Sequence, residues 1–245
     1  DTKQIFLVDS YRVTDAYLQG LRRFGRVFLL DDMQQHAYPV DGVINYNLFA
    51  SEEKYRELYG DTVPQYLGAP YVPVRQQFCD ASGSYAVAEQ VTDVLIPTGG
   101  GDIDNIAGEI LRQLAEYDLN GCPVRYHLVV GRFNPNREKL EQYASVHENV
   151  RLHCDVRDMA ALMAQCQLAV LGVPFVCFSY AENQEALTEW LGTQQIAGYA
   201  GAWHRAAGET LERIGAWCLK AQRDSGLRRQ CYETERGLID GLGAA

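Results

Sequence analysis

Short apolar runs alternate with helically spaced apolar positions along the first part of the chain. Residues 5–8, 26–30 and 42–45 have the length and composition of buried strands. Residues 17–24 and 51–58 carry apolar side chains at helical spacing. This order predicts a β-α-β unit followed by a third strand and a second helix.

The alternation begins again at Val91. The predicted strands and helices of this second series are strands at residues 94–97, 126–130 and 150–153 and helices at residues 106–115, 137–146 and 159–163. Such alternation is typical of a parallel sheet that is covered on both faces. From Gly201 onward the pattern is helical only, with an apolar stripe over residues 211–218.

A candidate linker separates the two series. Residues 67–75 are interrupted by prolines, and residues 80–84 have the composition of a loop. We therefore predict an N-terminal domain at residues 1–88 and a C-terminal domain, with the terminal helices, at residues 89–245. The expected fold class is α/β, with two Rossmann-like doubly wound domains facing each other across a cleft. We expect the N-terminal domain to be incomplete, because it has too few predicted strands for such a sheet.

The stretch from Cys166 to Gln184 has an unusual pattern. Its two apolar runs, residues 168–170 and 175–178, are separated only by residues 171–174. Successive parallel strands need a crossover of about a dozen residues or more. Either these strands form a tight antiparallel pair, or a segment of the intact protein is absent at the join between residues 170 and 171.

Composition and charge limit the class of protein. The chain has 245 residues, a formal net charge of −10 and a pI near 5.0. This balance disfavours sequence-independent nucleic-acid binding, which relies on Lys and Arg to neutralise phosphates. No apolar run approaches the roughly 20 residues of a membrane span. We expect a cytoplasmic protein that is a monomer or a weak homo-oligomer.

The first candidate site is a glycine loop between a predicted strand and a predicted helix. The backbone is not covered by side chains at Gly99, Gly100 and Gly101, so a ligand can approach it closely. Asn105 precedes the helix, whose first N–H groups can bind an anion. This favours phosphate binding. The loop is neither G-x-G-x-x-G nor a P-loop, and a tight strand-to-helix turn explains it equally well.

Two further candidates follow predicted strands, where open α/β sheets bind ligands. Asn183 and Gln184 follow the strand at residues 175–178 and offer amide donors and acceptors. The alternative is ordinary polarity in the first turn of a helix. Tyr11 follows the first strand and could bond a substrate or shuttle a proton, the alternative being a packed, half-exposed ring. Asp31 and Asp32 also end a strand, and turn formation or capping is their favoured interpretation.

The histidines and serines show no hydrolase motif. The five histidines lack a spacing such as H-E-x-x-H, and no serine lies in G-x-S-x-G. Metal-dependent and serine hydrolases are therefore disfavoured, and we expect no metal. His127 and His153 lie within predicted strands, where hydrogen-bonded core residues are expected rather than catalytic bases.

Short motifs in a characteristic order cover residues 8–11, 31–32, 45–47, 67–78, 98–105 and 181–184 (VDSY, DD, NYN, LGAPYVPVRQQF, TGGGDIDN and AENQ). In this succession, over about residues 5–192, the chain resembles the UDP-sugar hydrolases of pseudaminic acid biosynthesis and their relatives in spore-coat polysaccharide synthesis. That bacterial family is similar to the GT-B glycosyltransferases, in particular the N-acetylglucosaminyl transferase that makes the lipid precursor of peptidoglycan.

The resemblance implies metal-independent, cofactor-free hydrolysis at the anomeric carbon, which releases UDP and a free diacetamido-trideoxy sugar. It implies that Tyr11 and Asn183 contact the sugar. The residues that it assigns to UDP are Gly99, Gly100, Gly101, Asn105 and Gln184.

The sequence departs from the family's pattern in two places. The family opens with a strand and a G-x-G-H-x-x-R loop whose histidine is the presumed base, and nothing before Asp1 supplies it. The family also has a loop and a glutamate-bearing helix where residues 170 and 171 adjoin here. We expect both segments in the intact polypeptide. The alternatives to the hydrolase function are a glycosyltransferase of the same fold and a catalytically inactive nucleotide-sugar-binding homologue.

Overall fold

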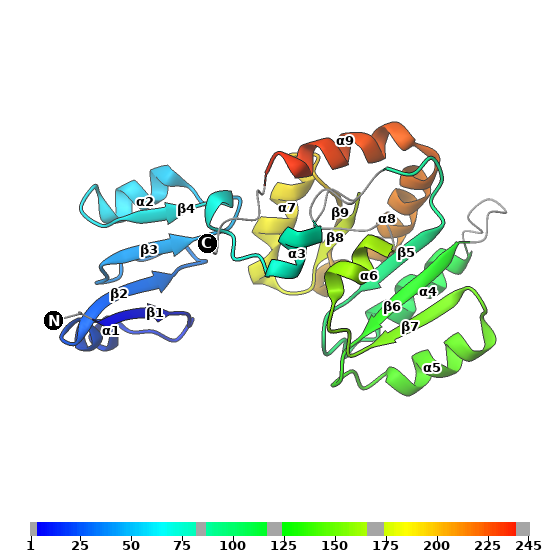
Figure 1. Cartoon of the computed structure of the whole chain (residues 1–245), viewed down its shortest axis with the longest axis horizontal. Helices are drawn as coiled ribbons and strands as arrows, with labels where there is room; N and C mark the ends of the chain where they lie inside the picture. Colours follow the sequence, from blue (N-terminus) through cyan, green and yellow to red (C-terminus); the bar gives the residue numbers. More distant parts are fainter. Residues whose placement is uncertain (1–3, 82–86, 117–123, 166–173, 239–245) are drawn as a thin grey trace. The chain divides into compact units, whose positions relative to one another are not determined.

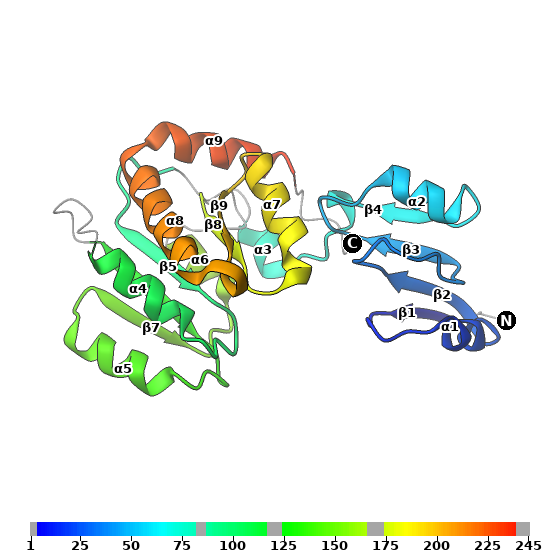
Figure 2. The ribbon, with the colours of Figure 1, turned by 180° about the vertical axis from the view of Figure 1, so that it is seen from behind.

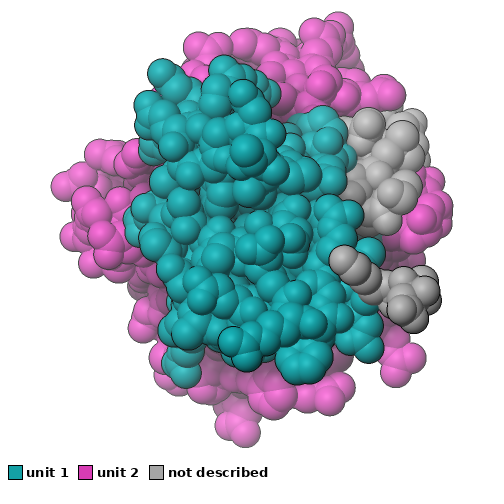
Figure 3. All heavy atoms as spheres, turned by 90° about the vertical axis from the view of Figure 1, so that its left-hand side faces the viewer, with its two compact units in different colours: residues 1–75, 239–245 teal, residues 76–238 magenta. Residues whose placement is uncertain are grey.

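The computed structural model of the chain describes residues 4–81, 87–116, 124–165 and 174–238. These residues form two compact units, unit 1 up to Arg75 and unit 2 from Gln76 to Leu238 (Figures 1 and 3). The predicted strand at residues 168–170 and the join that follows it lie outside the described residues. The domain boundary predicted after residue 88 stays a prediction.

Unit 1 is built on a parallel sheet whose strands follow one another in sequence order, β1-β2-β3-β4. Its elements are β1 (Gln4–Val8), α1 (Asp15–Arg22), β2 (Gly25–Leu30), β3 (Gly42–Asn45), α2 (Glu52–Tyr59), β4 (Gln65–Leu67) and the short 3-10 helix η1 (Ala69–Tyr71). The three predicted strands and both helices are confirmed. The prediction missed β4, because three residues without apolar alternation carry no strand signal.

One face of the unit 1 sheet forms its core. Val27 and Leu29 of β2 are buried there together with Leu18 of α1 and Tyr55 of α2. Both helical crossovers step in the same direction along the sheet, and right-handed crossovers then place both helices on the same face. On the opposite face Ile5 is exposed, and no described helix of unit 1 covers it.

Tyr55 fixes the carboxyl ends of β2 and β3. Its ring is fully buried, and its hydroxyl lies 2.8 Å from both Oδ2 and the backbone oxygen of Asp31. The same hydroxyl accepts a hydrogen bond from Asn45 Nδ2 at 3.0 Å. Burial, and then the charge of Asp31, raise the pKa of Tyr55, so the hydroxyl keeps its proton.

Unit 2 contains two parallel sheets, β5-β6-β7 and β8-β9. Its elements are α3 (Gln76–Ala81), β5 (Asp93–Pro97), α4 (Ile106–Glu116), β6 (Arg125–Val130), α5 (Arg137–Val146), β7 (Val150–Cys154), α6 (Met159–Gln165), β8 (Val176–Ser179), η2 (Glu182–Gln184), α7 (Glu185–Thr193), β9 (Gly198–Ala202), α8 (Trp203–Arg223) and α9 (Ser225–Arg236). The predicted alternation over residues 94–163 is confirmed. The prediction missed α3 and β9, and Gly201 lies in β9 rather than in a helix. The sequence of β9, Gly-Tyr-Ala-Gly-Ala, contains no β-branched residue.

Helices cover both faces of the β5-β6-β7 sheet (Figures 1 and 2). On one face Leu128 packs with Leu111 of α4, Leu140 of α5 and Ile214 of α8. On the other face Leu95 packs with α6. The parallel sheet is therefore buried on both sides, as its near-continuous apolar strands indicate.

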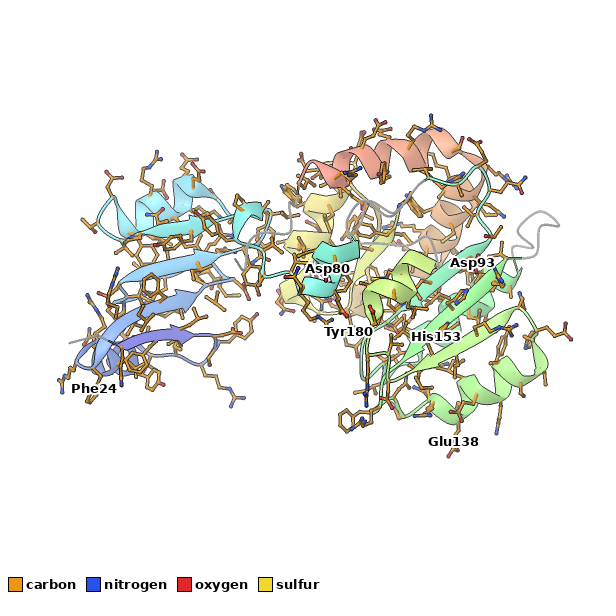
Figure 4. The ribbon with its side chains drawn as sticks, viewed as in Figure 1. Phe24, Asp80, Asp93, Glu138, His153 and Tyr180 are labelled. Atoms are coloured by element: carbon orange, nitrogen blue, oxygen red, sulfur yellow. The ribbon has the colours of Figure 1, made fainter. Side chains whose placement is uncertain are left out.

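A hydrogen-bonded polar cluster crosses β5, β6 and β7 (Figure 4). His127 Nε2 lies 2.8 Å from Asp93 Oδ1, and His127 Nδ1 lies 2.9 Å from His153 Nε2. Arg125 also pairs with Asp93, at 2.9 Å. Both histidines are hydrogen-bonded, as predicted, but each is only partly buried. Burial, and then His127, hold the pKa of His153 below its ordinary value.

We predict that Tyr55→Phe destabilises the protein by about 1–3 kcal/mol, because the buried Asp31 and Asn45 both lose their hydrogen-bond partner. Urea denaturation measures the free energy of unfolding. The control is Tyr17→Phe, since Tyr17 is 56% exposed, and it should change stability by less than about 0.5 kcal/mol. Equal stabilities of the two variants would contradict the assignment.

A second prediction concerns pH. Since the pKa of His153 is lower in the folded protein than the ordinary 6.5, folding disfavours its protonated form. Stability is then lost as pH falls from about 7 towards 5. Thermal unfolding of unit 2 should depend less steeply on pH in His153→Asn, whereas His36→Asn, in unit 1, should retain the wild-type slope. A His153→Asn slope equal to that of wild type would show that the His127–His153 pair does not control the pH dependence of unfolding.

Candidate functional site

The loops after the parallel strands of unit 2 form the candidate site. Residues 98–105 follow β5, residues 131–136 follow β6 and residues 180–184 follow β8. The carboxyl ends of parallel strands meet at one edge of a sheet, which is where open α/β sheets bind ligands. The predicted glycine loop and the predicted Asn183-Gln184 pair both lie at strand ends of this kind.

The glycine loop ends in a helix cap. Gly99 has a φ of +88°, which favours glycine. The Asp102 carboxylate accepts hydrogen bonds from the backbone N–H groups of Ile106, at 2.6 Å, and Ala107, at 3.1 Å. These N–H groups lie in the first turn of α4 and are the ones that were predicted to bind an anion. A phosphate at this helix would compete with Asp102, so the free backbone donors lie in the glycine segment itself.

The loop after β6 holds the glycine loop in place. Asn136 Nδ2 donates to the backbone oxygens of Asp102, at 2.9 Å, and Ile103, at 3.2 Å. Gly131 packs so closely on Gly100 that a Cβ atom at residue 131 would overlap the backbone of Gly100. The backbone of the glycine loop is therefore preorganised by a neighbouring strand end.

Buried polar atoms without a partner gather at the same strand ends. A buried donor or acceptor that lacks a partner costs about 1–3 kcal/mol, so it calls for an explanation such as a bound ligand or water. Asn134 and Ser179 are 6% and 0% exposed. The atoms at this edge for which the described residues supply no partner are Thr98 Oγ1, Asn105 Oδ1, Asn134 Nδ2 and Ser179 Oγ.

Of these four residues, only Asn105 was predicted to be a site residue. The available signal was position, because Thr98 directly follows β5, Ser179 ends β8 and Asn134 lies in the loop after β6. Their burial and lack of partners come only from the fold.

Tyr180 connects the segment after β8 to the glycine loop. Its hydroxyl donates to Asp104 Oδ2 at 2.9 Å, and its backbone N–H donates to Gln184 Oε1 at 2.9 Å. The hydrogen bond with Asp104 raises the pKa of Tyr180. Gln184 thus belongs to the same constellation as the glycine loop, and Asn183 is exposed beside it in η2.

The carboxyl ends of the strands in unit 1 carry a separate polar network. The hydroxyl of Tyr11, a residue 69% exposed, donates to Asp32 Oδ2 at 2.8 Å. Asn47 Nδ2 donates to Asp32 Oδ1 at 3.1 Å. The expected turn role is confirmed for Asp31, which accepts from the backbone N–H of Met33. The Asp32 carboxylate bonds the Tyr11 and Asn47 side chains, and the turn role expected for Asp32 stays a prediction.

Two further findings concern ligands and membranes. Among the residues that the structure describes, no group of His, Cys, Asp and Glu side chains is arranged to hold a metal ion. Within the same residues, no helix combines the length and apolarity needed to cross a bilayer.

Comparison with known proteins finds no matching family model. One curated relative, the UDP-2,4-diacetamido-2,4,6-trideoxy-beta-L-altropyranose hydrolase of Campylobacter jejuni, is 24% identical over 202 residues. The match covers 77% of this chain and 70% of the relative.

Solved structures of similar fold include TarM, with a TM-score of 0.53 and 9% identity, and the GtfA/B complex, with 0.53 and 8%. The glycosyltransferase WaaG, involved in lipopolysaccharide biosynthesis, has a TM-score of 0.50 and 12% identity. The matches cover 98%, 97% and 94% of this chain, respectively. They span 53% of TarM, 55% of the GtfA/B chain and 80% of WaaG, so the chain is about half the length of the first two. These likenesses confirm the predicted fold class: the chain is a mixed α/β protein with parallel sheets and a Rossmann-like GT-B fold.

Proposed function

We propose that the chain processes a UDP-sugar, and that the reaction is hydrolysis at the anomeric carbon. The products are UDP and a free diacetamido-trideoxy hexose that serves nonulosonic acid or surface polysaccharide synthesis. The name of the Campylobacter relative supports the substrate class. The structural observation that carries the proposal is the set of unpartnered buried polar atoms around the glycine loop of unit 2.

Unit 2 binds the nucleotide in this proposal. Backbone N–H groups of Gly99, Gly100 and Gly101 suit a diphosphate, because they bind an anion without a basic surface. This matters in a chain whose net charge is −10. Asn105 and Gln184 add side-chain amide groups. The hydroxyls of Thr98 and Ser179, which lack partners among the described residues, are further donors at the same edge.

The sugar contacts that we propose are Tyr11 and Asn183. Both side chains lie at the carboxyl end of a strand, Tyr11 in unit 1 and Asn183 in unit 2. In this proposal the reaction uses no metal or cofactor, and a general base that activates water contributes typically 10²–10⁴-fold.

The base that we propose is the histidine of the family's G-x-G-H-x-x-R loop, a motif that the resemblance implies and that the 245 residues do not contain. The histidines of this chain make the following contacts. His36 lies 3.1 Å from Asp15, and His204 lies 2.9 Å from Glu185. His147 Nδ1 lies 2.8 Å from the backbone oxygen of Tyr143, and His127 and His153 belong to the Asp93 cluster.

A glycosyltransferase is the second candidate, because the similar structures include one. Incubation with UDP-sugars separates the two candidates. UDP release without an acceptor supports hydrolysis, and strict dependence on an added acceptor alcohol supports transfer. Calorimetry with UDP is run on the same protein. Binding without turnover would support an inactive nucleotide-sugar-binding homologue, and a chain that does not bind UDP would refute all three.

We predict that Gly100→Val weakens UDP binding at least about tenfold without unfolding the protein. A Cβ atom at residue 100 meets open space, so the fold tolerates the side chain, which then blocks the approach of a phosphate to the backbone. The control is Gly208→Val in α8, where a Cβ atom also meets open space. Calorimetry measures affinity and circular dichroism checks folding. An unchanged affinity of Gly100→Val would remove the glycine loop from the site.

A further inference from the structure

The donor and the acceptor of each hydrogen bond around Tyr11 can be assigned. Beginning in the core, the Tyr55 hydroxyl donates to Asp31, and Asn45 Nδ2 donates to Tyr55. Asn45 Oδ1 in turn accepts from Asn47 Nδ2 at 2.8 Å and from the Asn47 backbone N–H at 2.9 Å. These contacts fix which end of each amide is the donor. The Asn47 side chain is therefore fixed as a donor by its contacts with Asn45, which is fully buried, as is Tyr55.

Asp32 receives hydrogen bonds on both carboxylate oxygens. Asn47 donates to Oδ1 at 3.1 Å and Tyr11 donates to Oδ2 at 2.8 Å. An ionised carboxylate only accepts hydrogen bonds, so the single hydroxyl proton of Tyr11 is directed at Asp32. The oxygen of Tyr11 is left with lone pairs, on a residue that is 69% exposed. Towards a ligand, this phenol is an acceptor.

We propose that Tyr11 accepts a hydrogen bond from an N–H or O–H group of the sugar, and that Asp32 is a positioning residue that holds Tyr11 in this polarity. The proposal rests on the proposed function and narrows the two roles open to Tyr11, substrate binding and proton transfer, to the first. A sugar with acetamido groups, like that of the Campylobacter relative's substrate, presents N–H donors of the required kind.

The electrostatics of Tyr11 agree with this geometry. The hydrogen bond to Asp32 and then the Asp32 charge raise the pKa of Tyr11, and Tyr46 and Asp9 act in the same direction. The phenol therefore keeps its proton at neutral pH. An acid with a raised pKa whose proton is bound by a carboxylate is poorly suited to donate that proton to a leaving group.

Asp32→Asn tests the polarity directly. Since Asn47 donates to the Oδ1 side of residue 32, the new amide keeps an oxygen there and turns its NH₂ group towards Tyr11. That group donates to the phenol oxygen, which reverses the hydrogen bond and frees the Tyr11 proton. If Tyr11 is an acceptor, the variant binds the sugar more weakly, whereas a Tyr11 that donated to the sugar would bind it more tightly.

The experiment measures affinities for UDP and for a UDP-diacetamido-trideoxy-hexose by calorimetry. We expect Tyr11→Phe and Asp32→Asn each to weaken binding of the UDP-sugar roughly three- to tenfold and to leave UDP binding unchanged. Tyr17→Phe on α1 should change neither affinity. Tighter or unchanged UDP-sugar binding by Asp32→Asn overturns the inference while the proposed function stands. A wild-type protein that binds neither compound overturns both.

A spectroscopic measurement distinguishes loss of the positioning of Tyr11 by Asp32 from a general disruption of the fold. The tyrosinate absorbance of each protein is titrated, and the contribution of Tyr11 is the difference from the matching Tyr11→Phe background. Asp32→Asn should lower the pKa of Tyr11 towards the ordinary 10.0. A Tyr11 pKa that does not change in Asp32→Asn shows that the carboxylate does not hold the phenol, and this outcome contradicts the proposal even if affinity falls.

Discussion

The parallel pairing of the strands determines where the polar side chains of the candidate sites gather. Every strand pair in the described residues is parallel, so within each sheet all strands end at the same edge. The polar segments that follow the strands are gathered at that edge. Residues that are distant in sequence, such as Asp104 and Tyr180, are thereby brought into contact. Each unit thus gathers polar side chains at the carboxyl ends of its strands, while the faces of the sheet supply most of the core.

The two edges differ in how far their polar groups are satisfied. In unit 1, Tyr55, Asn45, Asn47, Asp32 and Tyr11 form a continuous network, in which each donor has an acceptor. In unit 2, the buried hydroxyl of Ser179 and the Nδ2 group of Asn134 have no partner among the described residues. Unit 1 therefore presents a hydrogen-bonded Tyr11 at its end, and unit 2 presents buried polar groups that a bound ligand or water would satisfy.

The acidic character of the chain limits how such a ligand is bound. Asp102 and Asp104 follow the three glycines, and the Asp102 carboxylate accepts hydrogen bonds from the first N–H groups of α4. A diphosphate at this edge would meet the glycine backbone and neutral side chains, together with Arg132, which lies in the segment after β6 and pairs with Asp155 at 3.7 Å. The close packing of Gly131 on Gly100 keeps that backbone in position before any ligand arrives.

The sequence by itself determined the elements with a strong apolar period. It identified β1, β2, β3 and the alternation from β5 to α6, because buried strands and amphipathic helices require those patterns. It missed β4 and β9, where short length and small residues leave no pattern. Strand ends also pointed to Tyr11, Asn183 and Gln184. Only the tertiary structure paired Tyr11 with Asp32, 21 residues away, and left Ser179 buried without a partner. Such contacts depend on which strands adjoin, and a local pattern carries no information about that.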